Sequence, residues 1–176
     1  MRIAILTISD RSWRGERPDT SGPALSQVVL AQGWRVVSTR ILPDDQAQIS
    51  AQLIEWADSK AVDIILTTGG TGFSPRDVTP EATSSVIQRP APGLGEAMRQ
   101  VSLQKTPHAM LSRAISGIRG QTLIINLPGS PKAALENLAV VLPVLVHAIE
   151  LLKDDPHAEA GHQPAEFSVS HHPGVE

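Results

Sequence analysis

The chain has 176 residues, which is enough for one domain with a substantial buried core. Hydrophobic residues make up 41% of it and charged residues 19%, a composition typical of soluble globular proteins. A formal net charge of −3 and an aromatic content of 3% argue against a basic or base-stacking surface for nucleic acid. The absence of cysteine excludes disulfides, thiolate metal ligands and cysteine catalysis.

The N-terminus favours a first strand over a targeting segment. Residues 3–8 are a continuous apolar run of strand length, without the long hydrophobic region or small-residue cleavage site of a signal peptide. No apolar run is expected to reach the roughly 18 residues that a membrane-spanning helix requires. The sequence therefore predicts a cytoplasmic protein that does not enter a membrane.

Strand and helix signals alternate along the first half of the chain. A helix is predicted from Ser21 to a stop at Gly33, followed by a strand over 34–42. A second helix is predicted over 44–60, because apolar residues recur there at helical spacing. The residues expected on its inward face are Ile49, Leu53, Ile54 and Ala57.

The second half continues this alternation. Residues 62–68 predict a buried strand, and Thr79 is expected to cap the next helix with Pro80 at its first position. The remaining predicted elements are a helix over 94–104, two strands within 112–120 and 121–129, and a long helix from Ser130 to Leu152 that is kinked at Pro143.

Repeated β-α-β units imply a single α/β domain, a three-layer α/β/α sandwich around a mostly parallel sheet. We assign residues 1–153 to this domain. Residues 154–176 have little apolar periodicity and predict a flexible C-terminal tail. In open α/β sheets, ligands bind outside the carboxyl ends of the strands. The loops expected to meet there are 9–21, 42–45, 69–79 and 126–132.

A glycine-rich segment, Gly-Gly-Thr-Gly over 69–72, follows the predicted strand 62–68. It matches neither of the common phosphate-binding glycine motifs. Its backbone amides, together with the helix N-terminus at Thr79, could still hold a phosphate. The alternative is an ordinary tight turn.

A similar arrangement follows the last predicted strand, in Asn-Leu-Pro-Gly-Ser-Pro-Lys over 126–132. Lys132 in the first helical turn opposes the helix dipole unless an anion binds nearby. Ordinary capping by Ser130 is the alternative. Together, the two glycine-bearing turns suggest two anion-binding loops at one edge of the sheet.

Two aspartates are candidates for the chemistry at this edge. Asp44 ends the second predicted strand and Asp77 follows the third, so both carboxylates could reach one cleft. Two carboxylates beside phosphate-binding loops suit Mg²⁺, which shares its coordination shell with substrate oxygens. Alternatively, Asp44 caps a helix and Asp77 is a turn residue paired with Arg76.

Other polar residues have structural alternatives that are as good. Ser112, before the fourth strand, could be a buried structural serine, and Asp19 and Ser21 could simply cap a helix. The six histidines form no credible metal site. His147 is interpreted as an interfacial residue, and the solvated tail holds His157, His162, His171 and His172.

Several segments of the sequence resemble the MogA/MoaB family, including the G domains of plant Cnx and of gephyrin. The resemblance covers roughly residues 2–152. The segments that carry it are LTISD, PDTSGP, LPDD, TTGGTGFSPRDVTPEAT, PGLGEAMR and AMLSRAISGIRGQTLIINLPGSPKA. Some MoaB members lack the Arg-Asp-Val-Thr segment and are doubtful catalysts, whereas this chain retains it at 76–79.

The resemblance implies a molybdopterin adenylyltransferase that attaches AMP from Mg-ATP to the pterin and releases pyrophosphate. It also implies a homotrimer and a separate partner protein for molybdate insertion. A pterin-binding assembly protein without turnover is the main alternative, and a phosphohydrolase that uses the same loops is a more remote one. The catalytic residues implied by position are Asp44, Asp77 and Ser112, with Mg²⁺ at the two aspartates. The residues implied to bind substrate are Ser9, Asp10, Gly69, Gly70, Thr71, Gly72, Thr79, Arg113, Asn126, Pro128, Gly129 and Ser130.

Overall fold

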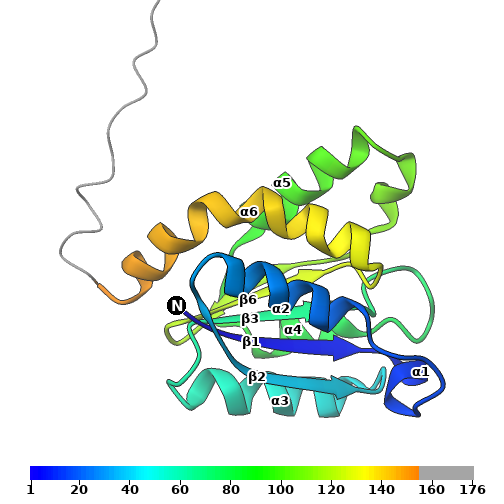
Figure 1. Cartoon of the computed structure of the whole chain (residues 1–176), viewed down its shortest axis with the longest axis horizontal. Helices are drawn as coiled ribbons and strands as arrows, with labels where there is room; N and C mark the ends of the chain where they lie inside the picture. The colour runs from blue at the N-terminus through cyan, green and yellow to red at the C-terminus, as the bar shows by residue number, and fades with distance from the viewer. Residues whose placement is uncertain (155–176) are drawn as a thin grey trace, which may run out of the picture.

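The computed structural model describes residues 1–154 (Figure 1). The predicted flexible tail lies outside the described residues, apart from Asp154. The strands are β1 (Arg2–Ile8), β2 (Arg35–Leu42), β3 (Ile64–Thr68), β4 (Arg89–Pro90), β5 (Ser116–Arg119) and β6 (Thr122–Leu127). The helices are α1 (Asp10–Trp13), α2 (Ser21–Ala31), α3 (Gln46–Asp58), α4 (Thr79–Val86), α5 (Pro92–Leu103) and α6 (Pro131–Leu152), with a 3₁₀ helix η1 (Pro107–Leu111).

The strands form one sheet in the order β2-β1-β3-β6-β5-β4. The pairs β1–β2, β1–β3 and β3–β6 are parallel, whereas β5 and β4 continue the sheet in antiparallel pairing. The predicted mostly parallel sheet is confirmed. Because β1, β2, β3 and β6 are mutually parallel, their carboxyl ends lie along one edge.

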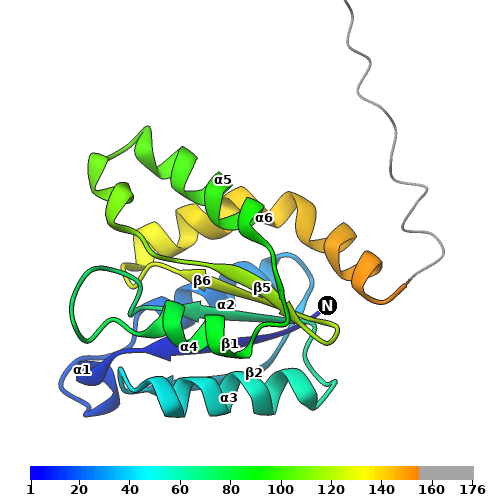
Figure 2. The same ribbon diagram turned by 180° about the vertical axis from the view of Figure 1, so that it is seen from behind.

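Helices cover both faces of the sheet, which confirms the three-layer sandwich (Figures 1 and 2). In β1, Ile3 and Ile5 pack with the hydrophobic side chains of α2 and α6. Ala4 and Leu6 of the same strand pack on the opposite face, with α3 and α4. The central strands are therefore buried on both sides, which explains why they read as continuous apolar runs rather than alternating ones.

Within residues 1–154, one helix is long and apolar enough to cross a membrane by length and composition alone. This helix is α6, which continues through Pro143. It packs against the sheet with Leu138, Val141, Leu145 and Ile149 in the core, each at most 3% exposed. Its apolar character therefore has a structural explanation within the domain, although no apolar segment of this length was expected from the sequence.

Two local predictions need correction. On α3, Ile54 is 37% exposed, and Gln52 and Trp56 lie on the buried face with the predicted Ile49, Leu53 and Ala57. Thr79 is the first residue of α4 rather than its N-cap, which is Val78. The Thr79 hydroxyl donates instead to the carbonyl of Gly69, at 2.8 Å, because α4 begins directly against the glycine-rich loop.

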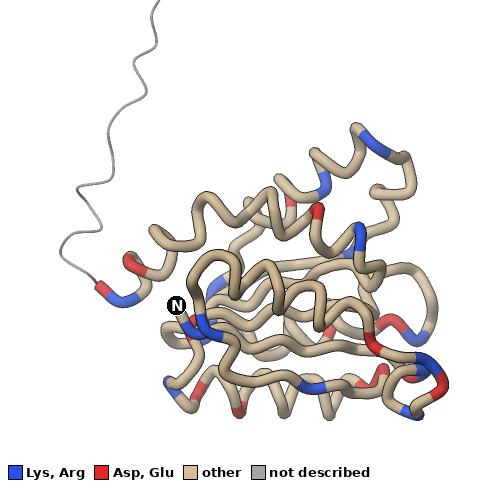
Figure 3. The backbone as a smooth tube through the Cα atoms, viewed as in Figure 1, with Lys and Arg blue, Asp and Glu red and all other residues tan. Residues whose placement is uncertain are grey.

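Charged residues gather around α1 and the neighbouring loops and near the N-terminus, while α2 has none (Figure 3). Near the N-terminus, Asp63 is buried between Arg2 and Lys153, with salt-bridge distances of 2.7 Å and 2.9 Å. This cluster lies at the amino-terminal edge of the sheet, where it joins the start of β1 to the end of α6.

Candidate active site

A cavity of about 520 Å³ opens at the carboxyl-terminal edge of the parallel strands. All four loops predicted to meet there contribute to its wall: the loop 9–21 contributes the most residues, and the loop after β2 contributes Asp44. The predicted site residues that line it are Ser9, Asp44, Gly69, Gly70, Asp77, Gly129 and Ser130. Strand order in the sheet therefore brings together residues that are more than 100 positions apart in the sequence.

The glycine-rich loop follows β3 and passes close to the end of β1, and its first two positions require glycine. Gly69 has φ +103°, and a Cβ at this position would lie 2.1 Å from the carbonyl oxygen of Ile8. Gly70 has φ +62°, and its Cβ would lie 2.4 Å from the Thr79 hydroxyl and 3.0 Å from Asp44 Oδ1. Both the backbone conformation and the surrounding atoms exclude a side chain. The loop backbone thus lies directly beside the Asp44 carboxylate.

The second turn, around Pro128 and Gly129, packs directly on the first. The Thr68 hydroxyl donates to the Pro128 carbonyl at 2.7 Å, and the Ser21 hydroxyl donates to the Gly129 carbonyl at 2.8 Å. A Cβ on Gly129 would lie 3.1 Å from the Cα of Gly69. The two turns predicted as anion-binding loops therefore form one continuous wall.

Asp44 is free of the capping role considered for it. Asp45, not Asp44, caps α3 by accepting a hydrogen bond from the Gln48 amide at 2.9 Å. Asp44 Oδ2 accepts from the Asp10 amide at 3.0 Å, and among the described residues Oδ1 accepts no hydrogen bond. One oxygen is thus held in place while the other remains available to a ligand.

Asp77 is anchored in the same manner. Its Oδ2 accepts from the amides of Gly72 and Ser74, at 2.9 Å and 3.2 Å, which closes the turn at 72–77. Its Oδ1 accepts no hydrogen bond from the part of the chain described. The considered pairing with Arg76 does not form, because Arg76 binds Asp10 instead.

The electrostatics of the cavity favour a cation. Burial raises the pKa of Asp44, and the nearby Asp10 and Asp77 carboxylates raise it further, against the hydrogen bond from Asp10. Burial also opposes ionisation of Asp10, but hydrogen bonds from Arg76 and the Asp44 amide outweigh this effect and lower its pKa. The raised pKa of Asp44 shows that its negative charge is not fully compensated by the protein.

Among residues 1–154, no group of three or more histidine, aspartate or glutamate side chains is arranged to hold a metal ion by itself. Mg²⁺ is commonly bound by one or two carboxylates and completes its shell with water and substrate phosphates. Asp44 and Asp77, each with an unused oxygen at the same cavity, fit that pattern. They do not form a complete metal site without a phosphate ligand.

The loop after β1 adds residues to the cavity that the sequence did not single out, namely Ser12, Arg17 and Thr20. Arg17 brings a positive charge, and its Nη2 donates to the Ser9 hydroxyl at 3.4 Å. Their position within the loop 9–21 was the only available signal. Asp19 Oδ1 accepts from the amides of Ser21 and Gly22 in the first turn of α2, although the N-cap is Thr20. Ser21 does not cap the helix, because it is the first residue of α2 and its hydroxyl donates to Gly129.

Ser112 does not share this cavity with the two aspartates. It lies after η1 and lines a second cavity of about 300 Å³, which also contains the predicted residues Thr71, Gly72 and Pro128. Thr71 and Gly72 directly follow the glycines of the first cavity, so the glycine-rich loop separates the two. Cationic and polar residues of the second cavity that sequence reasoning missed are Arg99, Lys105, His108 and Asn137.

Four predicted substrate-binding residues line neither cavity. Their side chains contact residues of the loops and strands that form the site. Asn126 is fully buried, and its amide donates to the hydroxyls of Thr67 and Thr83. Arg113 donates to the carbonyls of Gly72 and Asp77 at 2.7 Å and 2.6 Å, and it forms an ion pair with Glu81. The other two are Asp10 and Thr79, whose side chains bind Arg76 and the Gly69 carbonyl.

Comparison with known proteins connects this arrangement to a family. Residues 4–147 match the family described as "probable molybdopterin binding domain". The chain is 45% identical to gephyrin of Dictyostelium discoideum, with 88% of the chain aligned to only 23% of that protein. It is 44% identical to the molybdopterin adenylyltransferase of Escherichia coli K12, with 85% of the chain and 80% of the relative aligned.

Among solved structures, the molybdopterin biosynthesis enzyme MoaB of Thermus thermophilus superposes with a TM-score of 0.83 at 51% sequence identity. The superposition covers 88% of this chain and 98% of that one. The chain spans about a quarter of the length of the gephyrin relative but most of the length of the bacterial enzyme. The matched residues include both cavities and every loop that forms them, so this chain belongs to the molybdopterin-binding domain family.

Proposed function

We propose that this protein is a molybdopterin adenylyltransferase of molybdenum cofactor biosynthesis. In this reaction an oxygen of the pterin's phosphate attacks the α-phosphorus of ATP. A new phosphorus–oxygen bond forms, the bond between the α- and β-phosphates breaks, and pyrophosphate leaves. The product is adenylylated molybdopterin.

The observation that carries the proposal is the convergence of Asp44, Asp77 and the glycine-rich loop at one cavity. Such a site suits phosphoryl chemistry, in which most of the catalysis is positioning and charge stabilisation. The relative from E. coli, named molybdopterin adenylyltransferase, supports the same assignment. We assign the nucleotide phosphates to this cavity, close to the backbone of Gly69 and Gly70.

In the proposal, Asp44 and Asp77 would hold Mg²⁺ through their Oδ1 atoms, which accept no hydrogen bond within residues 1–154. When bound, the ion neutralises the negative charge of the phosphates. The protein's contribution is to fix both carboxylates through their Oδ2 atoms, at 3.0 Å from the Asp10 amide and 2.9 Å from the Gly72 amide. Arg17 offers a second positive charge at the cavity wall.

We further propose that Ser112 acts on the pterin from the second cavity. Both cavities border the glycine-rich loop, so the pterin and the nucleotide would meet along this loop. The proposal includes a cytoplasmic location, a homotrimer and delivery of the product to a separate molybdate-insertion protein. The location rests on the N-terminal sequence and the apolar runs, and the trimer and the partner rest on the family resemblance.

A pyrophosphate-release assay with Mg-ATP and molybdopterin tests the proposed function. We expect pyrophosphate release that depends on the pterin, together with AMP retained on it. Pterin binding without pyrophosphate release would identify the alternative, a pterin-binding assembly protein. Release of free AMP or phosphate without adenylylated pterin would identify a phosphohydrolase.

A further inference from the structure

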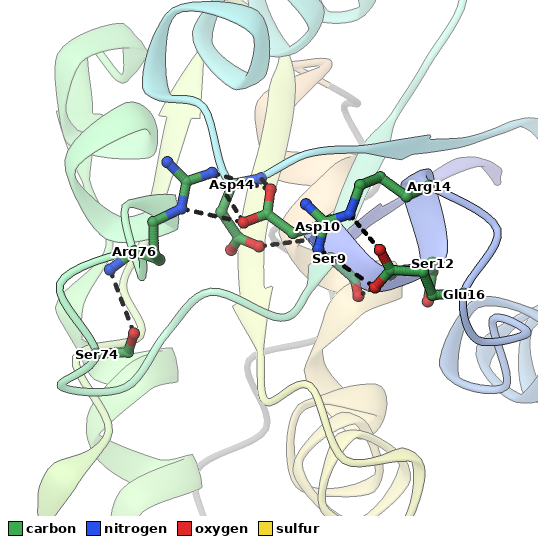
Figure 4. Close-up of polar contacts among 8 residues, drawn as sticks. All are labelled: Ser9, Asp10, Ser12, Arg14, Glu16, Asp44, Ser74 and Arg76. Atoms are coloured by element: carbon green, nitrogen blue, oxygen red, sulfur yellow. Dashed lines mark hydrogen bonds and ion pairs between the residues drawn. The ribbon is translucent and has the colours of Figure 1, made fainter.

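The carboxylate of Asp10 is the centre of a hydrogen-bond network that joins three loops (Figure 4). Asp10 and Asp44 form a reciprocal pair: the Asp10 amide donates to Asp44 Oδ2 at 3.0 Å, and the Asp44 amide donates to Asp10 Oδ1 at 3.1 Å. Each residue therefore fixes the backbone of the other. This pair connects the loop after β1 to the loop after β2.

Arg76 connects the loop after β3 to the same carboxylate. Its Nε donates to Asp10 Oδ2 at 3.0 Å, and its Nη2 lies 2.9 Å from Oδ1 and 2.8 Å from Oδ2. A two-pronged contact of this kind fixes orientation as well as distance, which a lysine cannot reproduce. Asp10 is thus held by a guanidinium on one side and by the Asp44 amide on the other.

Arg76 directly precedes Asp77, the other predicted metal-binding carboxylate. The 72–77 turn is closed internally, by the bonds from Gly72 and Ser74 to Asp77. Among the described residues, Arg76 forms one salt bridge, with Asp10, and this salt bridge joins the turn to the loop after β1. The hydrogen-bond network therefore runs from Arg76 through Asp10 to Asp44, and the peptide bond between Arg76 and Asp77 joins Asp77 to it.

We propose that the Arg76–Asp10 ion pair is a latch that sets the separation of the Asp44 and Asp77 carboxylates, which makes Arg76 and Asp10 positioning residues of the adenylyl-transfer site. This inference rests on the proposed function. It assigns Asp10 a role in holding Asp44 rather than in binding substrate. It assigns Arg76, the first residue of the Arg-Asp-Val-Thr segment, a role in positioning both aspartates.

The Arg76–Asp10 ion pair is expected to contribute little to the stability of the fold. Its effect on activity can therefore be measured without unfolding the protein. The Arg76 side chain is 63% exposed, and exposed ion pairs contribute little to global stability. Loss of the pair should therefore leave the melting temperature close to that of the wild type. Its effect should be local, because misplacing a reacting group by a fraction of an ångström is enough to slow a reaction.

The experiment compares Arg76→Ala, Arg76→Lys and Asp10→Asn with a matched control, Arg119→Ala. Arg119 also donates two hydrogen bonds to one aspartate, from Nε and Nη2 to Asp58 at 2.9 Å and 2.8 Å. It lines neither of the two site cavities. Two measurements are made on each variant: hydrogen exchange of the peptide spanning 70–78 in the ligand-free protein, and kcat and KM for pyrophosphate release.

We expect Arg76→Ala to speed exchange in 70–78 and to lower kcat by roughly 10- to 100-fold, with a smaller change in the KM for the pterin. Arg76→Lys should recover part of kcat. The double variant, Arg76→Ala with Asp10→Asn, should have a kcat close to that of the slower single variant, because both changes break the same network. Arg119→Ala should change neither measurement.

Unchanged exchange and kcat in Arg76→Ala would overturn the latch. So would additive losses in the double variant, since these would mean that the two residues act separately. The exchange measurement requires no turnover. If the wild type transfers no AMP, the proposed function fails, while faster exchange confined to the Arg76 and Asp10 variants would still establish the latch.

Discussion

At the scale of single residues, the two aspartates of the cavity are distinguished from their neighbours by hydrogen bonding. Asp44 and Asp45 are adjacent, yet Asp45 uses its carboxylate to cap α3, whereas one oxygen of Asp44 has no hydrogen-bond partner in the described part of the chain. Adjacent residues of the same type therefore have separable roles. This contrast supplies a matched control for the proposed chemistry.

Asp77→Asn should lower turnover by roughly 100-fold or more, equivalent to about 3 kcal/mol of transition-state stabilisation. Asparagine retains the size and one acceptor for the Gly72 amide but lacks the charge. Asp44→Asn should behave similarly, with a larger effect on the affinity for Mg²⁺ or ATP. Adenylylation and pterin binding are measured separately, and pterin binding should survive in both variants.

The control is Asp45→Asn, because asparagine caps helices as well as aspartate does. Its turnover should stay close to that of the wild type. Near-normal adenylylation by both Asp44→Asn and Asp77→Asn would show that these two carboxylates do not position a metal ion.

Gly69→Ala should destabilise the protein by roughly 3 kcal/mol or more, measured by chemical denaturation. Alanine at φ +103° is strained, and its Cβ would lie 2.1 Å from the Ile8 carbonyl, which belongs to a central strand and cannot easily move. Gly93→Ala is the control, since nothing lies within 4 Å of its Cβ and its φ lies outside the left-handed region. Equal effects of the two substitutions would contradict this explanation of the loop.

At the scale of secondary-structure elements, Asp63 ties the end of α6 to the start of β1. Its side chain is 3% exposed and contacts Arg2 and Lys153. Burial alone would raise the pKa of Asp63, but the hydrogen bonds from Arg2 and Lys153 outweigh burial and hold the pKa well below its usual range. The folded state therefore favours the ionised form of Asp63 more than the unfolded state does.

A depressed folded-state pKa contributes stability at pH values above the unfolded pKa of about 4, and this contribution is lost as the pH falls toward the folded pKa. Asp63→Asn should reduce the free energy of unfolding at pH 7 by about 1–3 kcal/mol. The difference from the wild type should shrink steadily below pH ~4. Urea denaturation from neutral to acidic pH measures both effects.

Asp58→Asn is the comparison, because Asp58 also pairs with an arginine but its side chain is 53% exposed. Its effect should be smaller than that of Asp63→Asn at every pH. A difference between wild type and Asp63→Asn that stays constant as the pH falls would show that the ion pairs do not account for the role of Asp63.

At the scale of the whole molecule, large apolar side chains remain at the surface. Around the end of α5 and η1, Leu103, Met110 and Leu111 are 44–66% exposed, and on α6 Val144 and Leu151 are about half exposed. Exposed apolar groups of this kind are typical of surfaces that bind other proteins. We propose the residues around the end of α5 and η1 as part of the surface for the proposed self-association.

Light scattering at micromolar concentration should give the mass of a trimer, about three times 18.8 kDa. Met110→Glu, which introduces a charge at a residue 66% exposed, should shift the distribution toward monomer without unfolding it. A stable wild-type monomer would contradict the trimer. A trimer that persists in the Met110 variant would place the interface elsewhere.

Local patterns were sufficient for much of this protein. The positions of β1 and β3 followed from apolar runs, because buried parallel strands need continuous apolar sequence. The position of α2 followed from a start signal at Ser21 and a stop at Gly33. The density of glycine over 69–72 indicated a turn or a phosphate-binding loop, whereas the requirement for glycine at 69 and 70 came from the structure. The edge of the sheet that holds the cavity followed from the β-α-β order, since ligands bind at the carboxyl ends of parallel strands.

Tertiary structure alone decided which polar residues meet. The family resemblance pointed to Asp44, but no local pattern told its hydrogen bonds from those of Asp45, or paired Arg76 with Asp10 across 66 positions, because such contacts depend on how loops from different strands pack. Packing also placed Ser112 in a separate cavity from the aspartates and buried Asn126 beneath the sheet edge. Periodicity and motif spacing determine elements and their order, whereas the direction of a side chain at the end of a loop is set by its neighbours in space.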